Sequence, residues 1–171
     1  FSESIIEEIS IPSKVSTICD NAFSKCNYLK KVEISPNSNL QTIGSGAFFD
    51  SDIEEIYFPS SLRELREGWC LGVDKLTKII ISPSNDQFIF KENKYLLGKT
   101  DPNIDEFDKF LFLRRDIKEI SIPSNIKIIS SDSFYNSMIE KISIPSNVST
   151  ICKRAFLLCT KLKKVEISPN S

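Results

Sequence analysis

Histidine is absent from this 171-residue sequence, and glycine is scarce, with five residues in the whole chain. Histidine is the usual general base of hydrolytic triads and the commonest side-chain metal ligand, so its absence weakens the case for both kinds of site. Phosphate-binding loops need closely spaced glycines, and neither G-x-x-x-x-G-K nor G-x-G-x-x-G occurs. The sequence therefore predicts a protein that is not an enzyme, with no catalytic residue, no cofactor and no metal site.

An excess of charge of either sign is also missing. The 22 basic and 23 acidic residues nearly cancel, and no basic run is interleaved with aromatic residues. Nucleic acid is therefore not expected as a partner. No apolar run is long enough to cross a bilayer, and no signal peptide is recognisable, so we expect no direct insertion of this stretch into a membrane.

What the sequence does contain is one short pattern that recurs along its length. Its copies begin near positions 6, 29, 53, 76, 117, 139 and 162, at steps of 22 to 24 residues apart from one step of 41. Such a period is typical of a solenoid. Residues 9–38 and 142–171 match at 23 of 30 positions, and no polar capping repeat is visible. We therefore expect one solenoid over residues 1–171 that is a fragment of a longer array.

Each copy carries the same signals in the same order. Apolar residues at alternate positions, as in Ile9 and Ile11, predict a short strand with one inward face, and the nearby Pro12 ends it because proline cannot donate a ladder hydrogen bond. A second apolar pair predicts a short return strand. A small residue followed by phenylalanine, as in Ala22-Phe23, is expected to close the coil on a single helical or 3₁₀ turn.

The closing phenylalanines are expected to stack as one buried column, composed of Phe23, Phe48, Phe134 and Phe156. In the third copy Trp69-Cys70 stands in place of the small residue and the phenylalanine. This exchange roughly conserves volume, which cores tolerate, so we interpret Trp69 as a core residue.

The string I-x-I-P-x-x-V-x-x-I-x-x-x-A-F-x-x-C resembles the BspA-like subfamily of leucine-rich repeats. The resemblance implies a strand-dominated leucine-rich repeat solenoid of the α/β horseshoe class, with short parallel strands on one face and return strands and helical turns on the other. It also implies a surface antigen or adhesion protein of bacteria or protozoan parasites, located at the cell surface or secreted. A cytoplasmic location is the alternative.

The outward positions of the front strands form the candidate binding surface, for a protein or a glycan. Neighbouring coils mostly carry opposite charges at the first of these positions, which favours correct register. The candidate residues are Glu8, Ser10, Lys31, Glu33, Glu55, Tyr57, Lys78, Ile80, Glu119 and Ser121. The alternative function is an intracellular scaffold or a structural spacer.

Five cysteines, at positions 19, 26, 70, 152 and 159, bear on these alternatives. Cys26 and Cys159 share a pattern position with small residues, so we expect reduced thiols that pack as small apolar groups. The alternative to reduced thiols is a pair of disulfides, one between positions 19 and 26 and one between positions 152 and 159. Free thiols favour an intracellular protein, whereas the family resemblance favours surface display.

The 41-residue step contains an insertion over about residues 91–116. Two apolar runs, at 94–98 and 109–113, flank a polar stretch and predict a β-hairpin with a long loop. We hypothesise that this hairpin contacts a partner or a second copy of the chain, the open ends of the solenoid being another route to self-association. The candidate hairpin contacts are Tyr95, Phe110, Phe112, Arg114 and Arg115.

Two short motifs complete the sequence. The stretch from Asp101 to Asp105 begins like a calcium loop, but Glu106 replaces the required glycine and Phe112 stands where a bidentate glutamate belongs, so an acidic turn is expected. The only N-glycosylation sequon begins at Asn147, which is therefore a candidate glycosylation site.

Overall fold

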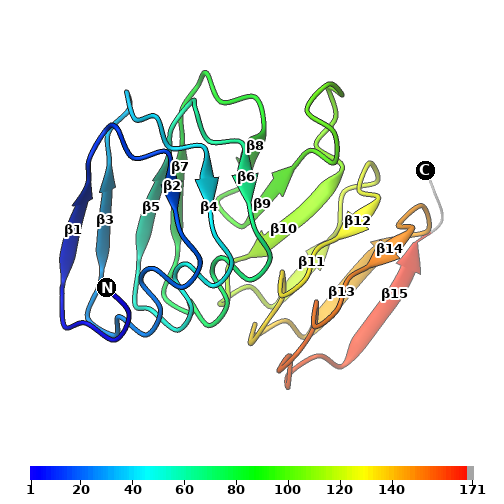
Figure 1. Ribbon diagram of the computed structural model, residues 1–171. Helices are drawn as coiled ribbons and strands as arrows, with labels where there is room; N and C mark the ends of the chain where they lie inside the picture. Colours follow the sequence, from blue (N-terminus) through cyan, green and yellow to red (C-terminus); the bar gives the residue numbers. More distant parts are fainter. Residues whose placement is uncertain (169–171) are drawn as a thin grey trace. The chain divides into compact units, whose positions relative to one another are not determined.

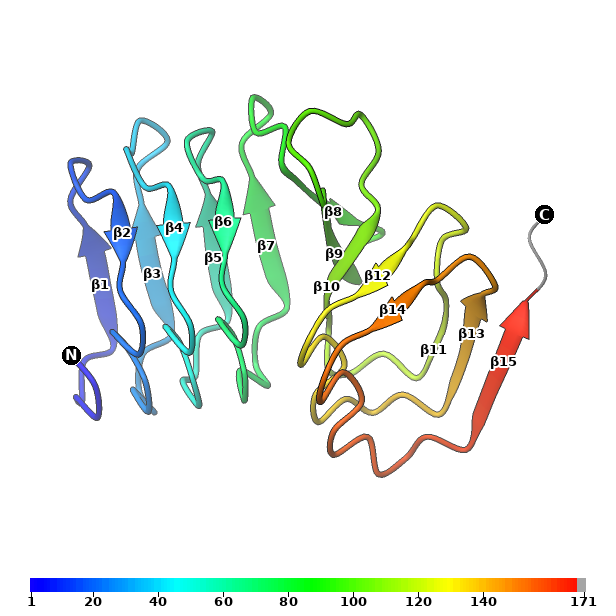
Figure 2. The same ribbon diagram turned by 45° about the vertical axis from the view of Figure 1, so that its right-hand side comes forward.

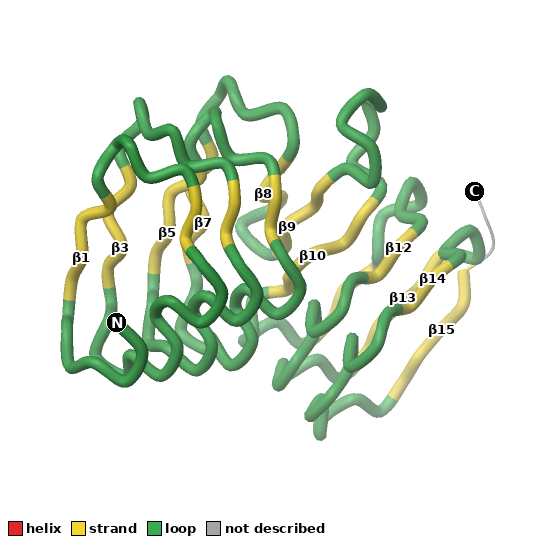
Figure 3. Tube along the Cα trace, in the orientation of Figure 1, coloured by secondary structure: helices red, strands yellow, loops and turns green. Residues whose placement is uncertain are grey.

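The computed structural model describes residues 1–168, which form fifteen strands joined by turns. No helix occurs among these residues, as Figure 3 shows. The chain divides into two compact units, residues 1–87 and 88–171. The sequence predicts one solenoid over the whole chain, and the structure contains a stack of coils in each unit.

Unit 1 consists of two parallel sheets, a front sheet and a return sheet, which are labelled in Figure 1. The front sheet contains β1 (Glu8–Ile11), β3 (Lys31–Ile34), β5 (Glu55–Phe58) and β7 (Lys78–Ile81), in that order. The return sheet contains β2 (Thr17–Ile18), β4 (Thr42–Ile43) and β6 (Glu64–Leu65). Each of the first three coils thus contributes one strand to the front sheet and one strand to the return sheet, and the fourth contributes β7 to the front sheet.

The alternating pattern explains the front strands. On β3, Val32 and Ile34 are buried, whereas Lys31 and Glu33 are exposed, because successive side chains point to opposite faces of a strand. Neighbouring front strands pair with equivalent repeat positions opposite each other, so that Glu8 lies beside Lys31. The predicted strands, their inward residues and their parallel register are therefore confirmed.

Unit 2 repeats this plan with a larger second sheet, which Figure 2 shows beside its front sheet. Its front sheet contains β11 (Glu119–Ser121), β13 (Lys141–Pro145) and β15 (Lys164–Ser168). The second sheet, in spatial order, contains β14 (Thr150–Ile151), β12 (Ile128–Ile129), β10 (Lys109–Leu113), β9 (Tyr95–Gly98) and β8 (Phe88–Lys91).

The predicted hairpin exists, as the antiparallel pair of β9 and β10, but it is part of this five-stranded sheet. Strand β10 pairs in parallel with β12, placing Phe110 opposite Ile129, and therefore occupies a return-strand position. Strand β8, which the sequence analysis did not predict, pairs with β9 across a tight turn. Glu92 and Asn93 in that turn have φ values of 53° and 52°, as a type I′ hairpin turn requires at both central residues.

Aromatic rings stack inside both units. In unit 1, Phe23 stacks on Phe48 with 5.5 Å between ring centroids, and Phe1 stacks on the other side of Phe23. In unit 2, the stack consists of Tyr95, Phe110, Phe134 and Phe156, with centroid spacings of 5.5, 4.9 and 4.6 Å. The predicted phenylalanines stack within each unit, and β9 and β10 supply Tyr95 and Phe110, which the sequence analysis did not place there.

Trp69 fits the volume-exchange interpretation. Its carbonyl oxygen accepts a hydrogen bond from the amide of Phe48, as the carbonyl of Ala47 does from Phe23, so Trp69 occupies the alanine position. Trp69 and Cys70 are both buried, and the indole packs edge-on against Phe58. The predicted core role of Trp69 is therefore confirmed.

The expected helical turns at the closing segments are not confirmed. Each complete closing segment is a pair of tight turns with two residues in the left-handed region, four positions apart, where the helical path is interrupted. These residues are Asn21 and Lys25, Gly46 and Asp50, Gly68 and Gly72, Asp132 and Asn136, and Arg154 and Leu158.

Candidate binding surface on the front sheets

The outward face of the front sheet in unit 1 contains two rows of side chains. The first row consists of Glu8, Lys31, Glu55 and Lys78, which are neighbours across the strands. The second row consists of Ser10, Glu33, Tyr57 and Ile80. The structure thus brings together eight of the ten residues that the sequence analysis proposed for this surface.

Most of the charged side chains on this face form ion pairs with one another. The Lys31 ammonium lies 2.7 Å from the Glu33 carboxylate, which also accepts a hydrogen bond from Ser10 at 2.6 Å. The hydrogen bond from Lys31 lowers the pKa of Glu33 and in turn raises the pKa of Lys31. Lys78 pairs with Glu55 on the neighbouring strand at 2.7 Å, so one rung of the predicted charge ladder is an ion pair.

Tyr57 and Ile80 make the apolar part of this face. They lie opposite each other on β5 and β7, and both side chains are accessible. An accessible aromatic ring beside an aliphatic side chain provides a contact area for an apolar or mixed ligand surface. The remaining two candidate residues, Glu119 and Ser121, belong to unit 2.

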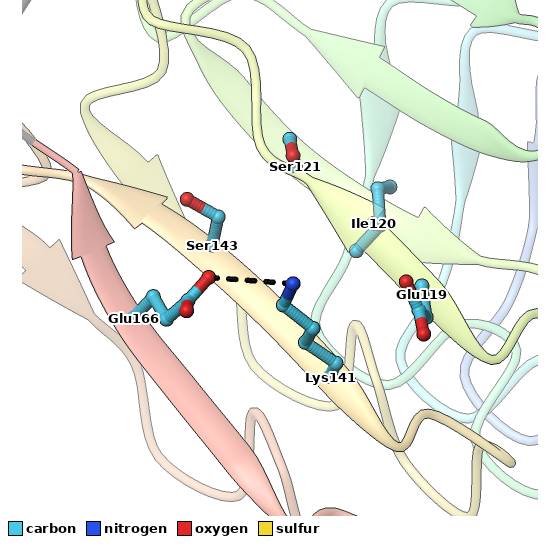
Figure 4. A pocket seen from close by; sticks show the side chains of 6 residues that line it. All are labelled: Glu119, Ile120, Ser121, Lys141, Ser143 and Glu166. Carbon is cyan, nitrogen blue, oxygen red and sulfur yellow. Dashed lines mark ion pairs between the residues drawn. The ribbon is translucent and has the colours of Figure 1, made fainter.

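The front sheet of unit 2 contains an open hollow of about 270 Å³. Figure 4 shows its lining, which consists of Glu119, Ile120, Ser121, Lys141, Ser143 and Glu166. Ser121 and Ser143 are neighbours across β11 and β13, so two small side chains leave space between the longer ones. Sequence reasoning named Glu119 and Ser121 but missed Lys141, Ser143 and Glu166, although these occupy the same outward rows in later coils.

Glu166 is the electrostatic centre of this hollow. Its carboxylate lies 2.6 Å from the ammonium of Lys164 and 3.6 Å from that of Lys141, the pair marked in Figure 4. The hydrogen bond from Lys164 is the largest cause that lowers the pKa of Glu166. The hollow therefore offers two carboxylates, an ammonium and two hydroxyl groups within one small area.

Four of the five hairpin residues proposed as partner contacts are buried. Tyr95, Phe110, Phe112 and Arg115 are buried in unit 2, because β9 and β10 belong to its sheet. The Arg115 guanidinium lies 4.7 Å from the centre of the Phe112 ring and donates to the carbonyl of Ser133. The folded unit therefore cannot present these four side chains to a partner.

Arg114, the fifth residue proposed at the hairpin, is half-buried. Its guanidinium forms two hydrogen bonds to the Asp116 carboxylate, at 3.0 and 2.6 Å, and donates to the carbonyl of Asn93. These bonds fix the turn between β8 and β9 against the end of β10. Arg114 thus has a positioning role in the hairpin.

The acidic turn between β9 and β10 is tied down by one buried carboxylate. Asp108 accepts hydrogen bonds from the backbone amide and the hydroxyl of Thr100, at 2.9 and 2.8 Å, and pairs with Lys127 at 3.4 Å. Burial alone would raise the pKa of Asp108, but these hydrogen bonds and the Lys127 charge outweigh it and lower that pKa. At the tip of the turn, Asp101 accepts from Asn103 in a local Asx turn.

The side chain of Asn147, the candidate glycosylation site, forms a hydrogen bond within the solenoid. Its amide nitrogen donates to the carbonyl of Ser124 in the preceding coil, and its amide oxygen is buried. Asn125 donates in the same way to Phe107, and Asn85 to Pro59 and Leu62. An asparagine at this turn therefore forms a hydrogen bond to the neighbouring coil. Its recurrence at the same position after the proline is the sequence signal from which this bond could have been predicted.

The sequence itself matches a known family over its whole length. Residues 1–93 and 86–171 match the family described as BspA type Leucine rich repeat region, in six copies. The chain belongs to the BspA-type leucine-rich repeat family. A search of curated proteins finds no match for this BspA-type chain.

Solved structures of similar fold include bacterial leucine-rich repeat proteins. The pneumococcal vaccine antigen PcpA is 25% identical with a TM-score of 0.86, over 100% of this BspA-type chain and 41% of that protein. A leucine-rich cell surface protein from Faecalibacterium prausnitzii is 20% identical with a TM-score of 0.83, over 95% of this chain and 42% of that one. A leucine-rich repeat protein from Eubacterium ventriosum is 17% identical with a TM-score of 0.61, over 96% and 60% of the two chains.

These matches establish a strand-dominated leucine-rich repeat solenoid. The BspA-type chain spans about two fifths of the length of PcpA and of the Faecalibacterium protein. Within residues 1–168, no helix has the length and apolar character that crossing a membrane requires.

Proposed function

We propose that this chain is a non-enzymatic binding module of a surface-displayed antigen or adhesion protein, and that its front sheets bind a protein or a glycan. The observation that carries the proposal is a contrast between the two faces of the front strands. In every coil, the inward residue directly before the residue of the second outward row is isoleucine or valine. These inward residues are Ile9, Val32, Ile56, Ile79, Ile120, Ile142 and Val165. The second outward row changes in chemistry from coil to coil.

That outward row reads Ser10, Glu33, Tyr57 and Ile80 in unit 1, and Ser121, Ser143 and Glu166 in unit 2. A solenoid needs uniform inward residues for packing, but it does not need a particular outward side chain. Variation within one chain at structurally equivalent outward positions is the arrangement expected of a surface that recognises something irregular. This surface differs most from a simple alternation of charges at two places. One is the pair of Tyr57 and Ile80, and the other is the hollow of unit 2.

Surface display is supported by the proteins of similar fold. One is a pneumococcal vaccine antigen, and another is a leucine-rich cell surface protein of Faecalibacterium prausnitzii. The alternative, an intracellular scaffold or spacer, is favoured by the five free thiols, since disulfides are common in extracellular proteins.

The binding proposal can be tested by screening the 171-residue chain on arrays of extracellular proteins and of glycans. For any ligand found, we expect a loss of at least tenfold in affinity from Tyr57→Ala combined with Ile80→Ser, or from Ser143→Arg, which fills the hollow. Thr17→Arg, at an exposed position of the return strand β2, is the matched control and should bind normally. A ligand whose affinity falls only with Thr17→Arg would contradict the assignment to the front sheets.

Location can be tested separately. Antibodies against the chain should label intact cells of the source organism, and external protease should remove that labelling. Labelling only after lysis would refute surface display and support the intracellular scaffold, whatever the outcome of the binding screen.

A further inference from the structure

Tyr57 is the only aromatic residue at an outward position of the front strands within residues 1–168. Its strand, β5, lies between β3 and β7, so the chain itself supplies the neighbours on both sides. Among the residues that the structure describes, the Tyr57 ring makes no stacking or cation–π contact, and its hydroxyl forms no hydrogen bond. The accessible part of this ring is therefore available to a ligand.

The two neighbours of Tyr57 in the second outward row differ in chemistry. On β7, Ile80 lies directly opposite Tyr57 and is 37% exposed. On β3, the register of the front strands places Glu33 on the other side. Adjacent strands are about 4.8 Å apart, so both neighbours are within reach of a group that rests on the ring. A ligand at Tyr57 therefore meets an aliphatic side chain on one side and a carboxylate on the other.

Glu33 belongs to a hydrogen-bond network that exists without a ligand. One carboxylate oxygen accepts a hydrogen bond from the Lys31 ammonium at 2.7 Å, and the other accepts one from the Ser10 hydroxyl at 2.6 Å. A carboxylate has several acceptor positions and an ammonium has three donors, so both groups can form further hydrogen bonds. Because the network already orders these side chains, a ligand that binds here immobilises few additional rotamers.

These features suit a sugar ring better than a protein surface. A pyranose ring carries C–H groups on its faces and hydroxyl groups around its rim. The C–H groups bear partial positive charge and are attracted to the negative face of an aromatic ring. The hydroxyl groups donate and accept hydrogen bonds, which is what Glu33 and Lys31 together require. The core of a protein interface is instead depleted of charged residues, whereas the ion pair of Lys78 with Glu55 lies on the same face as Tyr57.

The charges of this face indicate an uncharged sugar. The outward side chains of its four strands include three carboxylates and two ammonium groups, which belong to Glu8, Glu33, Glu55, Lys31 and Lys78. Each ammonium pairs with a carboxylate at 2.7 Å. A sialylated or sulfated sugar would therefore add negative charge to a face whose cations are already neutralised.

We propose that Tyr57 is a subsite for one uncharged pyranose ring of a glycan. The sugar stacks on the tyrosine ring, and its hydroxyl groups form hydrogen bonds with Glu33 and Lys31. Its opposite edge contacts Ile80. This inference rests on the proposed binding function of the front sheets, and it names the chemical class of ligand at one place on them.

Saturation-transfer difference NMR of the 171-residue chain with the methyl glycosides of glucose, galactose, mannose and N-acetylglucosamine tests the proposal. At least one of these uncharged sugars should show transfer to its ring C–H protons, and the methyl glycoside of N-acetylneuraminic acid should show none. Tyr57→Phe keeps the ring and should bind nearly as well as the unchanged chain. Tyr57→Leu keeps an apolar side chain without a ring and should lose affinity about tenfold, as expected for a lost aromatic contact.

Tyr28→Leu is the matched control, because it removes an exposed tyrosine from a closing turn and leaves the front sheet intact. This variant should bind the sugar as the unchanged chain does. The circular dichroism spectrum of Tyr57→Leu should also be unchanged, since its side chain points away from the core. Equal binding by Tyr57→Leu and the unchanged chain, equal losses in Tyr57→Leu and Tyr28→Leu, or transfer to the sialic acid glycoside alone would each overturn the proposed subsite.

An absence of transfer to all five glycosides would overturn it as well, and the array screen then separates this failure from that of the binding function. A protein ligand that loses affinity with Tyr57→Ala combined with Ile80→Ser would retain the binding function of the front sheet and refute the sugar subsite. If no ligand of either kind responds to changes in the front sheets, both proposals fail.

Discussion

Left-handed backbone positions are the strictest local requirement of this repeat. Several are held by asparagine or glycine, which adopt this conformation readily. Leu158 is an exception, with a φ of 61° and a largely exposed side chain. A leucine in this conformation is strained because its Cβ crowds the backbone, and little packing compensates for that strain.

We predict that Leu158→Asn stabilises the chain by about 0.5–1 kcal/mol, part of the roughly 1–2 kcal/mol that a left-handed residue costs. Urea denaturation measures the free energy of unfolding. Leu157→Asn is the control, since Leu157 has similar exposure but no left-handed φ, and it should give no gain. Equal effects of the two substitutions would show that polarity, and not backbone strain, is responsible.

Asp108 gives a pH-dependent prediction. Its pKa in the folded chain lies below its ordinary value of 3.8. A depressed folded pKa means that the folded state binds its proton less readily than the unfolded state, so this group contributes stability above about pH 4 that is lost as the pH falls towards the folded pKa. Asp108→Asn should therefore flatten the acid side of the stability profile.

At neutral pH, Asp108→Asn should lower the free energy of unfolding by about 1–3 kcal/mol, because the buried side chain loses charged hydrogen bonds to Thr100 and the ion pair with Lys127. Denaturant titrations between pH 7 and 3 measure both effects. Asp105→Asn in the same loop is exposed and serves as the control. If both variants follow the acid profile of the unchanged chain, Asp108 does not hold the loop through its charge.

Single positions were predictable from sequence where the alternating pattern decides them. Val32 is buried and Glu33 is exposed because successive side chains on a strand face opposite ways. Arg115 was not predictable, since charged residues are rarely buried and its place over Phe112 depends on the strand pairing of unit 2. The hollow beside Glu166 was missed for a related reason, because it arises from serines on different coils.

At the scale of elements, the aromatic stacks are the clearest common feature of the closing turns. Phe134 is fully buried, with Phe110 on one side and Phe156 on the other. A phenylalanine in such a place contributes both transfer free energy and contacts that no neighbour can replace.

We predict that Phe134→Ala lowers the free energy of unfolding by about 3–5 kcal/mol, because it leaves a cavity in addition to the lost apolar burial. Denaturant unfolding followed by fluorescence and circular dichroism provides the measurement. Tyr28→Ala removes an exposed aromatic side chain and should have little effect. An unchanged stability of Phe134→Ala would mean that the stack does not form as described.

The strands and return strands were predictable because each carries its own local pattern. Strand β8 was missed, since the run from Phe88 to Lys91 falls outside the repeat and its turn lacks the glycine that usually marks a short hairpin loop. The role of β10 as a return strand was also hidden, because parallel pairing with β12 depends on a partner distant in the sequence. Four of the five hairpin residues proposed as partner contacts are therefore buried in the unit instead.

At the scale of the whole molecule, the repeat period predicted the solenoid, but it did not predict the division between Gln87 and Phe88. The period lapses at this point, where the pattern of the coil beginning at position 76 gives way to β8. A period describes how equivalent coils stack. It does not indicate whether an interrupted stack unfolds as one body or as two.

We predict that the fragment 88–171 folds alone. Its hydrophobic cluster lies wholly within the unit and extends from Tyr95 to Ala155, including the buried Phe110 and Phe134. Its two sheets pair without strands from unit 1. A unit with its own core and complete strand pairing is expected to unfold cooperatively.

Circular dichroism of this fragment should show β-structure, and urea should unfold it in one cooperative transition. The fragment carrying Phe134→Ala is the control, because it lacks the centre of the cluster and should lose that transition or shift it to much lower urea. If instead the unchanged fragment shows no cooperative transition, while the 171-residue chain unfolds in a single step, the two units depend on each other. The chain would then behave as the single solenoid that the repeat period predicts.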